Sequence, residues 1–221
     1  TGLTARPLKC CVGFKSLGYL GHTLGEGAIS PDPEKVRQLQ QAERPTTKTE
    51  VRSFLGLAGY YRRYVPNFST IAAPLSDLTR KKAPTKIEWT ENCEKAFQAL
   101  KDRLTSDAIV KLPDLSKEFV LRTDASDTGL GAVLLQQHRE TLFPVAYASR
   151  KLLPAEKNYA VSEKECLALV FGVTHFERYL YGRKFVLETD HQPLAYLAQA
   201  KLTNNRLMRW SLFLQPYQIQ I

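Results

Sequence analysis

A hexapeptide occurs twice in this chain, and its recurrence limits the folds that the chain can adopt. Residues 119–124 are FVLRTD and residues 185–190 are FVLETD, so five of six positions agree and both copies end in Thr-Asp. Each copy is short and rich in β-prone residues, which predicts a strand. The segment between the copies includes a helical pattern, and a strand, a helix and a returning strand form a right-handed crossover between parallel strands.

Parallel neighbours would bring the two final carboxylates together. Side chains alternate along a strand, so Asp124 and Asp190 take equivalent positions at one edge of the sheet. Two carboxylates at such a separation repel each other unless they share a proton or a cation lies between them. Because carboxylate oxygens suit Mg²⁺ and Mn²⁺, the repeat predicts a divalent metal site.

The helical segment between the copies supplies a third acidic residue. Ser162 and Glu165 have the spacing of a capping box, so we expect the helix to begin there and Glu165 to reach the same edge from the first turn. Each acidic residue also has a purely structural interpretation, in which Asp124 and Asp190 end strands and Glu165 completes the capping box.

Three further polar residues near this edge are interpreted as structural. Glu163 is a first-turn helix charge and Asp127 is a turn former. His191 follows Asp190 directly, but hard divalent cations prefer oxygen ligands to an imidazole nitrogen. We therefore expect the metal site to consist of carboxylates.

The first half of the chain begins with a β-rich segment. Residues 8–29 combine apolar and β-prone residues with repeated glycines, which predicts two short strands joined by tight turns. Pro31 and Pro33 are expected to close this segment.

A helical pattern follows. Thr47 and Glu50 have capping-box spacing ahead of an apolar face, and Pro66 is expected to end that helix. Thr90 is the predicted N-cap of a second helix. Residues 46–104 therefore predict a small helical domain.

A turn-rich segment separates the two halves of the chain. Residues 105–118 contain a proline and no sustained period, which predicts a linker. Beyond it, FVLRTD, GAVLLQQ and PVAYASR predict three successive strands with antiparallel neighbours.

The charge balance points to a polyanionic partner. The chain has 31 Lys and Arg against 22 Asp and Glu, a net charge of +9, and such a surplus favours a polyanion over a small neutral ligand. No apolar run approaches the ~18 to 20 residues of a membrane span, and the first residues lack the apolar core of a secretory signal. We expect no membrane association and an intracellular protein, cytoplasmic or nuclear. The four cysteines form no C-x-x-C pair, so neither a disulfide nor a zinc framework is expected.

Several motifs, in order, resemble one family along nearly the whole chain: SLGYLGH, RSFLGLAGYYRRYVPNFSTIAAPL, TDASDTGLGAVLLQ, AVSEKECLAL and GRKFVLETDHQPL. The chain is similar to the C-terminal part of a reverse transcriptase from a gypsy-type LTR retrotransposon. The resemblance implies an α/β fold, an RNase H-like mixed sheet with a crossover helix, in which the first and fourth strands are parallel neighbours.

The resemblance also implies a division into domains. Residues 1–45 correspond to the end of the polymerase palm with a primer-grip-like hairpin, and residues 46–108 to a helical thumb. Residues 109–118 form a linker, and residues 119–221 an RNase H-like domain that lacks its C-terminal helix. The expected partners are the polymerase palm and fingers in a longer polypeptide.

By the same resemblance, Asp124, Glu165 and Asp190 match the first three metal-binding carboxylates of a ribonuclease H. The implied reaction is hydrolysis of the RNA strand of an RNA–DNA hybrid with two Mg²⁺ or Mn²⁺ ions. The family has a fourth aspartate on a C-terminal helix, to which no residue of this chain corresponds, so we expect weak metal binding and slow or absent cleavage. The polymerase aspartates have no counterpart either, and no DNA synthesis is expected.

Two further pairs of residues are candidate nucleic-acid contacts. Gly18 and Tyr19 lie in LGYLGH, which resembles the hairpin that contacts the primer strand, although a simple structural hairpin explains them equally well. Arg62 and Arg63 follow two tyrosines and are placed to meet phosphates, the alternative being a solvated face.

Two classes of function therefore stay open. The first is an enzyme, a retroelement ribonuclease H with its thumb. The second is a non-catalytic module derived from a retrotransposon that binds nucleic acid or protein, including a non-catalytic subunit of a reverse-transcriptase dimer. Intact carboxylates favour the first class, and the missing fourth aspartate favours the second.

Overall fold

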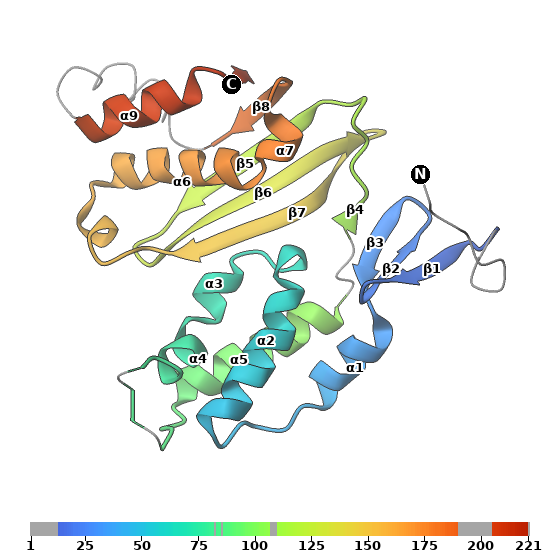
Figure 1. The fold of residues 1–221 in the computed structure, drawn as a ribbon, viewed down its shortest axis with the longest axis vertical. Coiled ribbons are helices and arrows are strands. Elements are labelled where there is room, and N and C mark those ends of the chain that lie inside the picture. Colours follow the sequence, from blue (N-terminus) through green and yellow to red (C-terminus); the bar gives the residue numbers. More distant parts are fainter. Residues whose placement is uncertain (1–12, 82, 85, 107–109, 190–204, 221) are drawn as a thin grey trace, which may run out of the picture.

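The computed structural model of the chain describes residues 13–81, 83–84, 86–106, 110–189 and 205–220. The described residues form two sheets and several helices. The helices within residues 33–105, called the helical group below, lie beside the larger sheet (Figure 1). The larger sheet is mixed, in the order β7-β6-β5-β8-β9. Its strands are β5 (Phe119–Ala125), β6 (Gly129–His138), β7 (Thr141–Lys151), β8 (Lys184–Glu188) and β9 (Gln218–Gln220).

The expected crossover is present in the larger sheet. Between β5 and β8 the chain forms α6 (Val161–His175) and α7 (Glu177–Leu180), and β8 then pairs with β5 in parallel. The strands β5, β6 and β7 are antiparallel neighbours, as their spacing predicted. The fold class is therefore confirmed.

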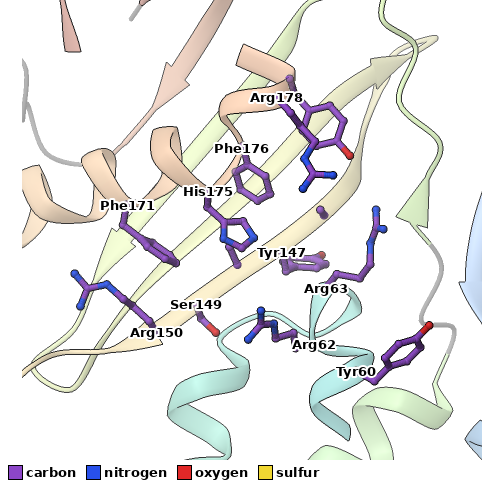
Figure 2. A pocket seen from close by; sticks show the side chains of 13 residues that line it. Tyr60, Arg62, Arg63, Tyr147, Ser149, Arg150, Phe171, His175, Phe176 and Arg178 are labelled. Atoms are coloured by element: carbon purple, nitrogen blue, oxygen red, sulfur yellow. The ribbon is translucent and has the colours of Figure 1, made fainter. Parts of the chain in front are cut away.

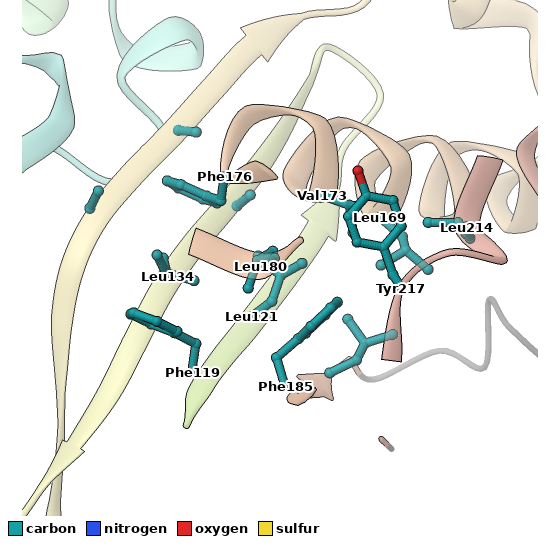
Figure 3. Packing of buried hydrophobic residues seen from close by; sticks show 14 of the residues in the cluster. Phe119, Leu121, Leu134, Leu169, Val173, Phe176, Leu180, Phe185, Leu214 and Tyr217 are labelled. Atoms are coloured by element: carbon teal, nitrogen blue, oxygen red, sulfur yellow. The ribbon is translucent and has the colours of Figure 1, made fainter. Parts of the chain in front are cut away.

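The core of this domain lies between the sheet and α6. Phe119, Leu121 and Phe185 are fully buried there, and Leu169 and Val173 face them from α6 (Figure 3). Burial of each such side chain contributes about 1.5–3 kcal/mol. Alternate residues of the repeat thus form the core, which leaves the other residues of β5 for the opposite face.

Helix α6 begins earlier than its sequence suggests. Ala160 is the N-cap, and its backbone N–H donates to the Glu163 carboxylate (3.1 Å). The predicted capping box of Ser162 and Glu165 is therefore wrong, because Glu163 already meets the free N–H group at the helix start. Glu165 lies in the second turn, and its interpretation as a capping residue no longer holds.

The last described segment, residues 205–220, adds a helix beside α6 and an edge strand beside β8. Helix α9 (Asn205–Leu214) packs against α6 through Leu207 and Leu214. Strand β9 then pairs in parallel with β8 and is the edge strand on this side of the sheet.

The helical group contains the two predicted helices, α2 and α5, together with α1, α3, α4 and a 3-10 turn that were not predicted. Thr47 and Glu50 form the capping box of α2, and Thr90 caps α5. Helix α2 ends at Tyr60, before Pro66, and a short 3-10 turn follows. Asp32 caps a helix that we did not predict, and Pro33 begins it instead of closing a β segment. The α-helices of this group are α1 (Pro33–Gln41), α2 (Lys48–Tyr60), α3 (Phe68–Ile71), α4 (Ala73–Leu78) and α5 (Glu91–Thr105).

The smaller sheet contains more than the two predicted strands. It is antiparallel in the order β1-β2-β3-β4, and β4 comes from the segment expected to be a linker. Gln136 of the larger sheet also bonds both to the N–H (2.8 Å) and to the C=O (2.7 Å) of Asp114 in that segment. The strands are β1 (Ser16–Tyr19), β2 (His22–Gly25), β3 (Ala28–Pro31) and β4 (Val110–Lys111).

The helical group packs directly on the edge strand of the larger sheet. The Ser69 N–H donates to Ser149 Oγ (2.9 Å), and Lys151 Nζ donates to Asp77 Oδ1 (2.8 Å) and to Ala73 O (3.1 Å). Hydrogen bonds thus connect the two parts of the chain. Across the described residues, every helix is too short or too polar to traverse a bilayer.

Candidate catalytic edge and nucleic-acid interface

The two copies of the repeat lie side by side with like residues opposite each other. The pairs run from Phe119 opposite Phe185 to Arg122 opposite Glu188. Arg122 also donates through Nε to Glu188 (2.9 Å), which joins the two strands on the face away from α6. This register brings equivalent positions of the repeat to the same end of the sheet.

The start of α6 lies at this same end of the sheet. Both β5 and β8 point toward the end at which α6 begins (Figure 1). Lys164, in the first turns of α6 and only 7% exposed, donates to Asp127 just beyond β5 (2.8 Å). This hydrogen bond lowers the pKa of Asp127, as does the Lys164 charge. Asp127 is therefore more than a turn former, because it fixes the start of α6 against the end of β5.

Asp124 and Glu165 have different surroundings at this edge. Asp124 is exposed, whereas Glu165 is 2% exposed and borders the buried Cys166. Burial, and then the charges of Glu165 and Glu163, raise the pKa of Cys166 to about 12. The Cys166 thiol is therefore protonated near neutral pH. Of these two neighbouring side chains, only the Glu165 carboxylate offers oxygen atoms as ligands.

Alternation along β5 places Thr123 and Asp124 on opposite faces. Thr123 lies under α6, where Gly172 approaches so closely that a Cβ would be 3.1 Å from Thr123 Cγ2. Asp124 pairs with Gly131, and Gly131 pairs with Ser149. These three residues form a row across the face opposite α6. A carboxylate from α6 therefore has to meet Asp124 around the end of the sheet, and not across its face.

The helical group contributes a side chain to this row. Asn67 has a left-handed backbone (φ 52°), and its Oδ1 lies 2.6 Å from the place that a Cβ of residue 131 would take. Only glycine leaves room there. Asn67 thus lies over the residue that pairs with Asp124, a position that no local sequence pattern indicates.

A metal ion at this edge would be held by oxygen ligands. Of the three predicted ligands, Asp124 and Glu165 are described and Asp190 lies outside the described residues. Within the described part of the chain, no three His, Cys, Asp or Glu side chains gather closely enough to hold an ion. An exposed and a buried carboxylate at one end of the sheet are donors that suit Mg²⁺ or Mn²⁺.

The predicted primer-grip-like hairpin is formed by β1 and β2. Gly18 lies in β1, and Tyr19 at its end is 58% exposed. The turn that follows is attached to α2, since Tyr60 donates to Leu20 O (2.5 Å) and Tyr61 donates to Gly21 O (2.8 Å). The hairpin is thus held at its tip and presents the Tyr19 ring outward.

Arg62 and Arg63 lie in the 3-10 turn that follows α2, beside the larger sheet. They line a cavity of about 460 Å³ that also contacts β7, α6 and α7 (Figure 2). Arg178 and His175 border the same cavity, and neither was singled out from the sequence. The Arg pair therefore faces a shared space between the two parts of the chain.

A comparison with protein families identifies the domain to which the larger sheet belongs. Residues 114–217 match the family described as an RNase H-like domain found in reverse transcriptase. This span contains the strands β5 to β8 of the sheet together with α6, α7 and α9, and it ends just before β9. The chain therefore carries the RNase H-like domain of a reverse transcriptase.

The relatives of the chain are Pol polyproteins of gypsy-type transposons. It is 42% identical over 213 residues to the retrovirus-related Pol polyprotein from transposon 297 of Drosophila melanogaster, which covers 96% of the chain and 20% of the relative. It is 38% identical over 220 residues to that of transposon gypsy, covering 94% and 21%. The chain thus spans about a fifth of the length of these relatives.

Solved structures share the fold. The structure of the foamy viral protease-reverse transcriptase in complex with RNA/DNA hybrid matches with a TM-score of 0.79 and 21% identity, over 93% of this chain and 28% of that one. The same protein in complex with dsDNA matches with a TM-score of 0.77, over 94% and 44%. The matches extend over most of the chain, so the helical group and the sheet share their arrangement with these proteins.

Proposed function

We propose that the chain is the ribonuclease H region of a retroelement reverse transcriptase, together with its thumb, and that it hydrolyses the RNA strand of RNA–DNA hybrids. The observation that carries this proposal is the register of β5 and β8, which aligns two strands that each continue into Thr-Asp. The family match and the fold support it.

In this proposal Asp124, Glu165 and Asp190 hold the metal. Asp124 follows Arg122 by two residues and Asp190 follows Glu188 by two residues in the sequence, and Arg122 and Glu188 are paired in the sheet. Divalent ions bound there would supply an activated water and stabilise the leaving oxygen.

Other residues of the chain hold this edge in place. The Lys164–Asp127 hydrogen bond fixes the start of α6 against the end of β5, and with it the backbone that carries Glu165. Arg122 pairs with Glu188 and so joins β5 to β8 on the Asp124 face of the sheet.

The test compares cleavage of a labelled RNA–DNA hybrid, with Mn²⁺, by the wild-type chain and by Asp124→Asn. Loss of a residue that only orients a metal ligand slows a reaction by about 10- to 100-fold. Loss of a ligand itself, as in Asp124→Asn, should slow cleavage by more than that. Both chains are also assayed within a longer Pol polypeptide that includes this segment. The matched control is Asp102→Asn, an exposed aspartate of α5, which should cleave at the wild-type rate.

Equal cleavage by Asp124→Asn and wild type in the longer polypeptide would refute the proposal. Hybrid binding without cleavage by any of these chains, with the fold intact by circular dichroism, would support the non-catalytic binding module instead. Cleavage that depends on Asp124 but not on Asp102 would support the enzyme.

A further inference from the structure

The cavity between the helical group and the RNase H-like domain is lined by positive charge. It lies at the far end of α6 from the catalytic edge, since His175 follows Glu165 by ten residues, or about 15 Å along a helix. Arg62 and Arg63 line it from one side, and Arg178 lines it from α7. No Asp or Glu is among the described residues that line it.

The three arginines direct their charge toward this space. Figure 2 shows the guanidinium groups of Arg62 and Arg63 rising toward His175 and Arg178, whereas Arg150 turns away. Arg150 is already bound by the two carboxylate oxygens of Glu156 (2.6 and 3.0 Å). Among the described residues, no carboxylate forms an ion pair with Arg62, Arg63 or Arg178, so their charge is available to a ligand.

One of these arginines has a donor that the described residues leave unmet. Arg63 Nε is buried and has no hydrogen-bond partner in the described part of the chain, and its guanidinium lies 5.9 Å from the centre of the Tyr64 ring. A buried donor without an acceptor is unfavourable. An anionic oxygen in the cavity would supply the acceptor.

The pKa of His175 is lowered by burial and by positive charges from both sides of the cavity. Burial lowers its pKa, and the nearby charges of Arg62 and Arg178 lower it further. The ring is therefore neutral at neutral pH and adds a hydrogen-bonding group without adding charge. Arg62 belongs to the helical group and Arg178 to the RNase H-like domain, so both parts of the chain contribute to one electropositive site.

The shape of the lining favours a phosphate carried on a larger molecule. Guanidinium groups bind phosphate oxygens through paired N–H donors. The rings of Tyr147, Phe171 and Tyr179 border the same cavity, and flat rings suit a sugar or a base. A small inorganic anion alone would leave these rings without a contact.

We propose that this cavity binds one backbone phosphate of a nucleic-acid strand, held by Arg62 and Arg63 on one side and Arg178 on the other. The identification of the strand rests on the proposed function, whereas the anion site itself does not. A phosphate bound there would connect the thumb and the RNase H-like domain through one ligand.

The first experiment tests the anion site without any nucleic acid. Inorganic phosphate is titrated into the ¹⁵N-labelled chain, and the arginine Nε–H resonances are followed by NMR, with sodium chloride at matched ionic strength as the control. We expect the Arg63 Nε–H resonance to shift with phosphate beyond its shift with chloride. Identical shifts with the two salts would overturn the anion site.

The second experiment tests the nucleic-acid strand. Affinity for an RNA–DNA hybrid is measured against salt concentration for the wild type, Arg178→Gln and the control Arg209→Gln, an exposed arginine of α9. Each phosphate contact contributes about 0.9 to the slope of log K against log salt on a duplex. We expect Arg178→Gln to reduce the slope by about that amount and Arg209→Gln to leave it unchanged.

The outcomes separate this inference from the proposed enzyme. Asp124→Asn should lose cleavage yet keep the wild-type salt slope, because it leaves the cavity intact. A wild-type slope for Arg178→Gln would overturn the nucleic-acid contact, whether or not the chain cleaves. Should Arg178→Gln fail to fold by circular dichroism, Arg62→Gln gives the same comparison from the other side of the cavity.

Discussion

At the scale of single residues, the buried Glu156 carboxylate is met by specific partners close by in the sequence. Glu156 is 8% exposed and accepts hydrogen bonds from Arg150 and from the Leu153 N–H (2.8 Å). Arg150 also lies 5.6 Å from the centre of the Phe171 ring on α6. This group fixes the connection between β7 and α6, and therefore the path of the chain toward the end of the sheet at which Asp124 and Glu165 lie.

The pKa of Glu156 predicts how this connection responds to acid. Burial would raise the pKa, but the hydrogen bonds from Arg150 and Leu153, with the Arg150 charge, hold it below its ordinary value of 4.5. A lowered folded-state pKa means that the stabilisation is full above about pH 4.5 and is lost as the pH falls through the folded value. Glu156→Gln should cost about 1–3 kcal/mol of unfolding free energy at pH 7.

The measurement is urea unfolding of the wild type and Glu156→Gln between pH 3 and pH 7. The difference between the two chains should shrink below about pH 4.5. A difference that stays constant across this range would contradict the role of the carboxylate charge. Glu91→Gln, at an exposed carboxylate in the first turn of α5, serves as the control.

Sequence patterns predicted some of these residues and not others. Asp124 was found because its strand repeats, but Lys164 and Asn67 carry no local signal. A lysine in the first turns of a helix is usually solvated, and only the tertiary fold brings Lys164 to Asp127. Asn67 is important because it lies close to Gly131, which is 64 positions later in the sequence.

At the scale of elements, the helices α2 and α5 and the strands β5 to β8 follow from capping and alternation. The starts of α2 and α5 and the strands β5 to β8 were predicted because their apolar faces have a clear period. Helix α1 was missed because Pro33 was interpreted as an end, although proline is equally suited to the first turn of a helix. The start of α6 was misplaced because two acidic residues, Glu163 and Glu165, compete for the same capping role.

The hairpin of β1 and β2 owes its position to two tyrosine hydroxyls. Removing both, as Tyr60→Phe with Tyr61→Phe, eliminates the bonds to Leu20 and Gly21 and should cost about 0.5–1.5 kcal/mol for each bond. Amide hydrogen exchange in residues 16–25 should accelerate, while exchange in β5 and β6 stays unchanged.

Tyr181→Phe is the matched control, since this exposed tyrosine lies in the RNase H-like domain, away from the hairpin. If exchange in residues 16–25 is the same in the double variant and the wild type, the hydroxyl groups do not hold the hairpin. Hybrid affinity of the folded double variant then reports whether a fixed Tyr19 matters for nucleic-acid binding.

At the scale of the whole molecule, the helical group and the RNase H-like domain meet over a tightly fitted contact. Asn67 lies over Gly131, and Ser69 and Ser149 are hydrogen-bonded beside it. Local sequence patterns carry no indication of this contact, because residues far apart in the sequence form it. The contact reaches the row of residues that ends in Asp124.

Gly131→Ala tests how tightly the two parts fit. The added Cβ would lie 2.6 Å from Asn67 Oδ1, so the Asn67 side chain has to move. We expect a loss of about 1–3 kcal/mol in urea unfolding, as for other overpacked sites, and faster exchange of the Ser69 N–H. Adding Asn67→Gly, which suits the left-handed backbone there, should restore most of the loss.

If Gly131→Ala with Asn67→Gly is as unstable as Gly131→Ala alone, the added methyl group does not act through the Asn67 side chain, and the strain lies elsewhere in the sheet. Gly56→Ala is the control, because that glycine of α2 has open space around its Cβ position. Alanine also has the higher helix propensity, so this control should be neutral or slightly stabilising.

Two strands with the same apolar face compete for one place while the chain folds. Beside β6, β8 could bury its Phe and Leu much as β5 does, since the repeat gives both strands these residues. Chain connectivity separates them, because β5 reaches β6 through the short loop of residues 126–128, whereas β8 is separated from β6 by β7 and α6. Closing the short loop costs less conformational entropy. The β5–β6 hairpin should therefore assemble first, so that β8 finds only the outer side of β5 free, and the order of events during folding assigns two nearly interchangeable strands to different places.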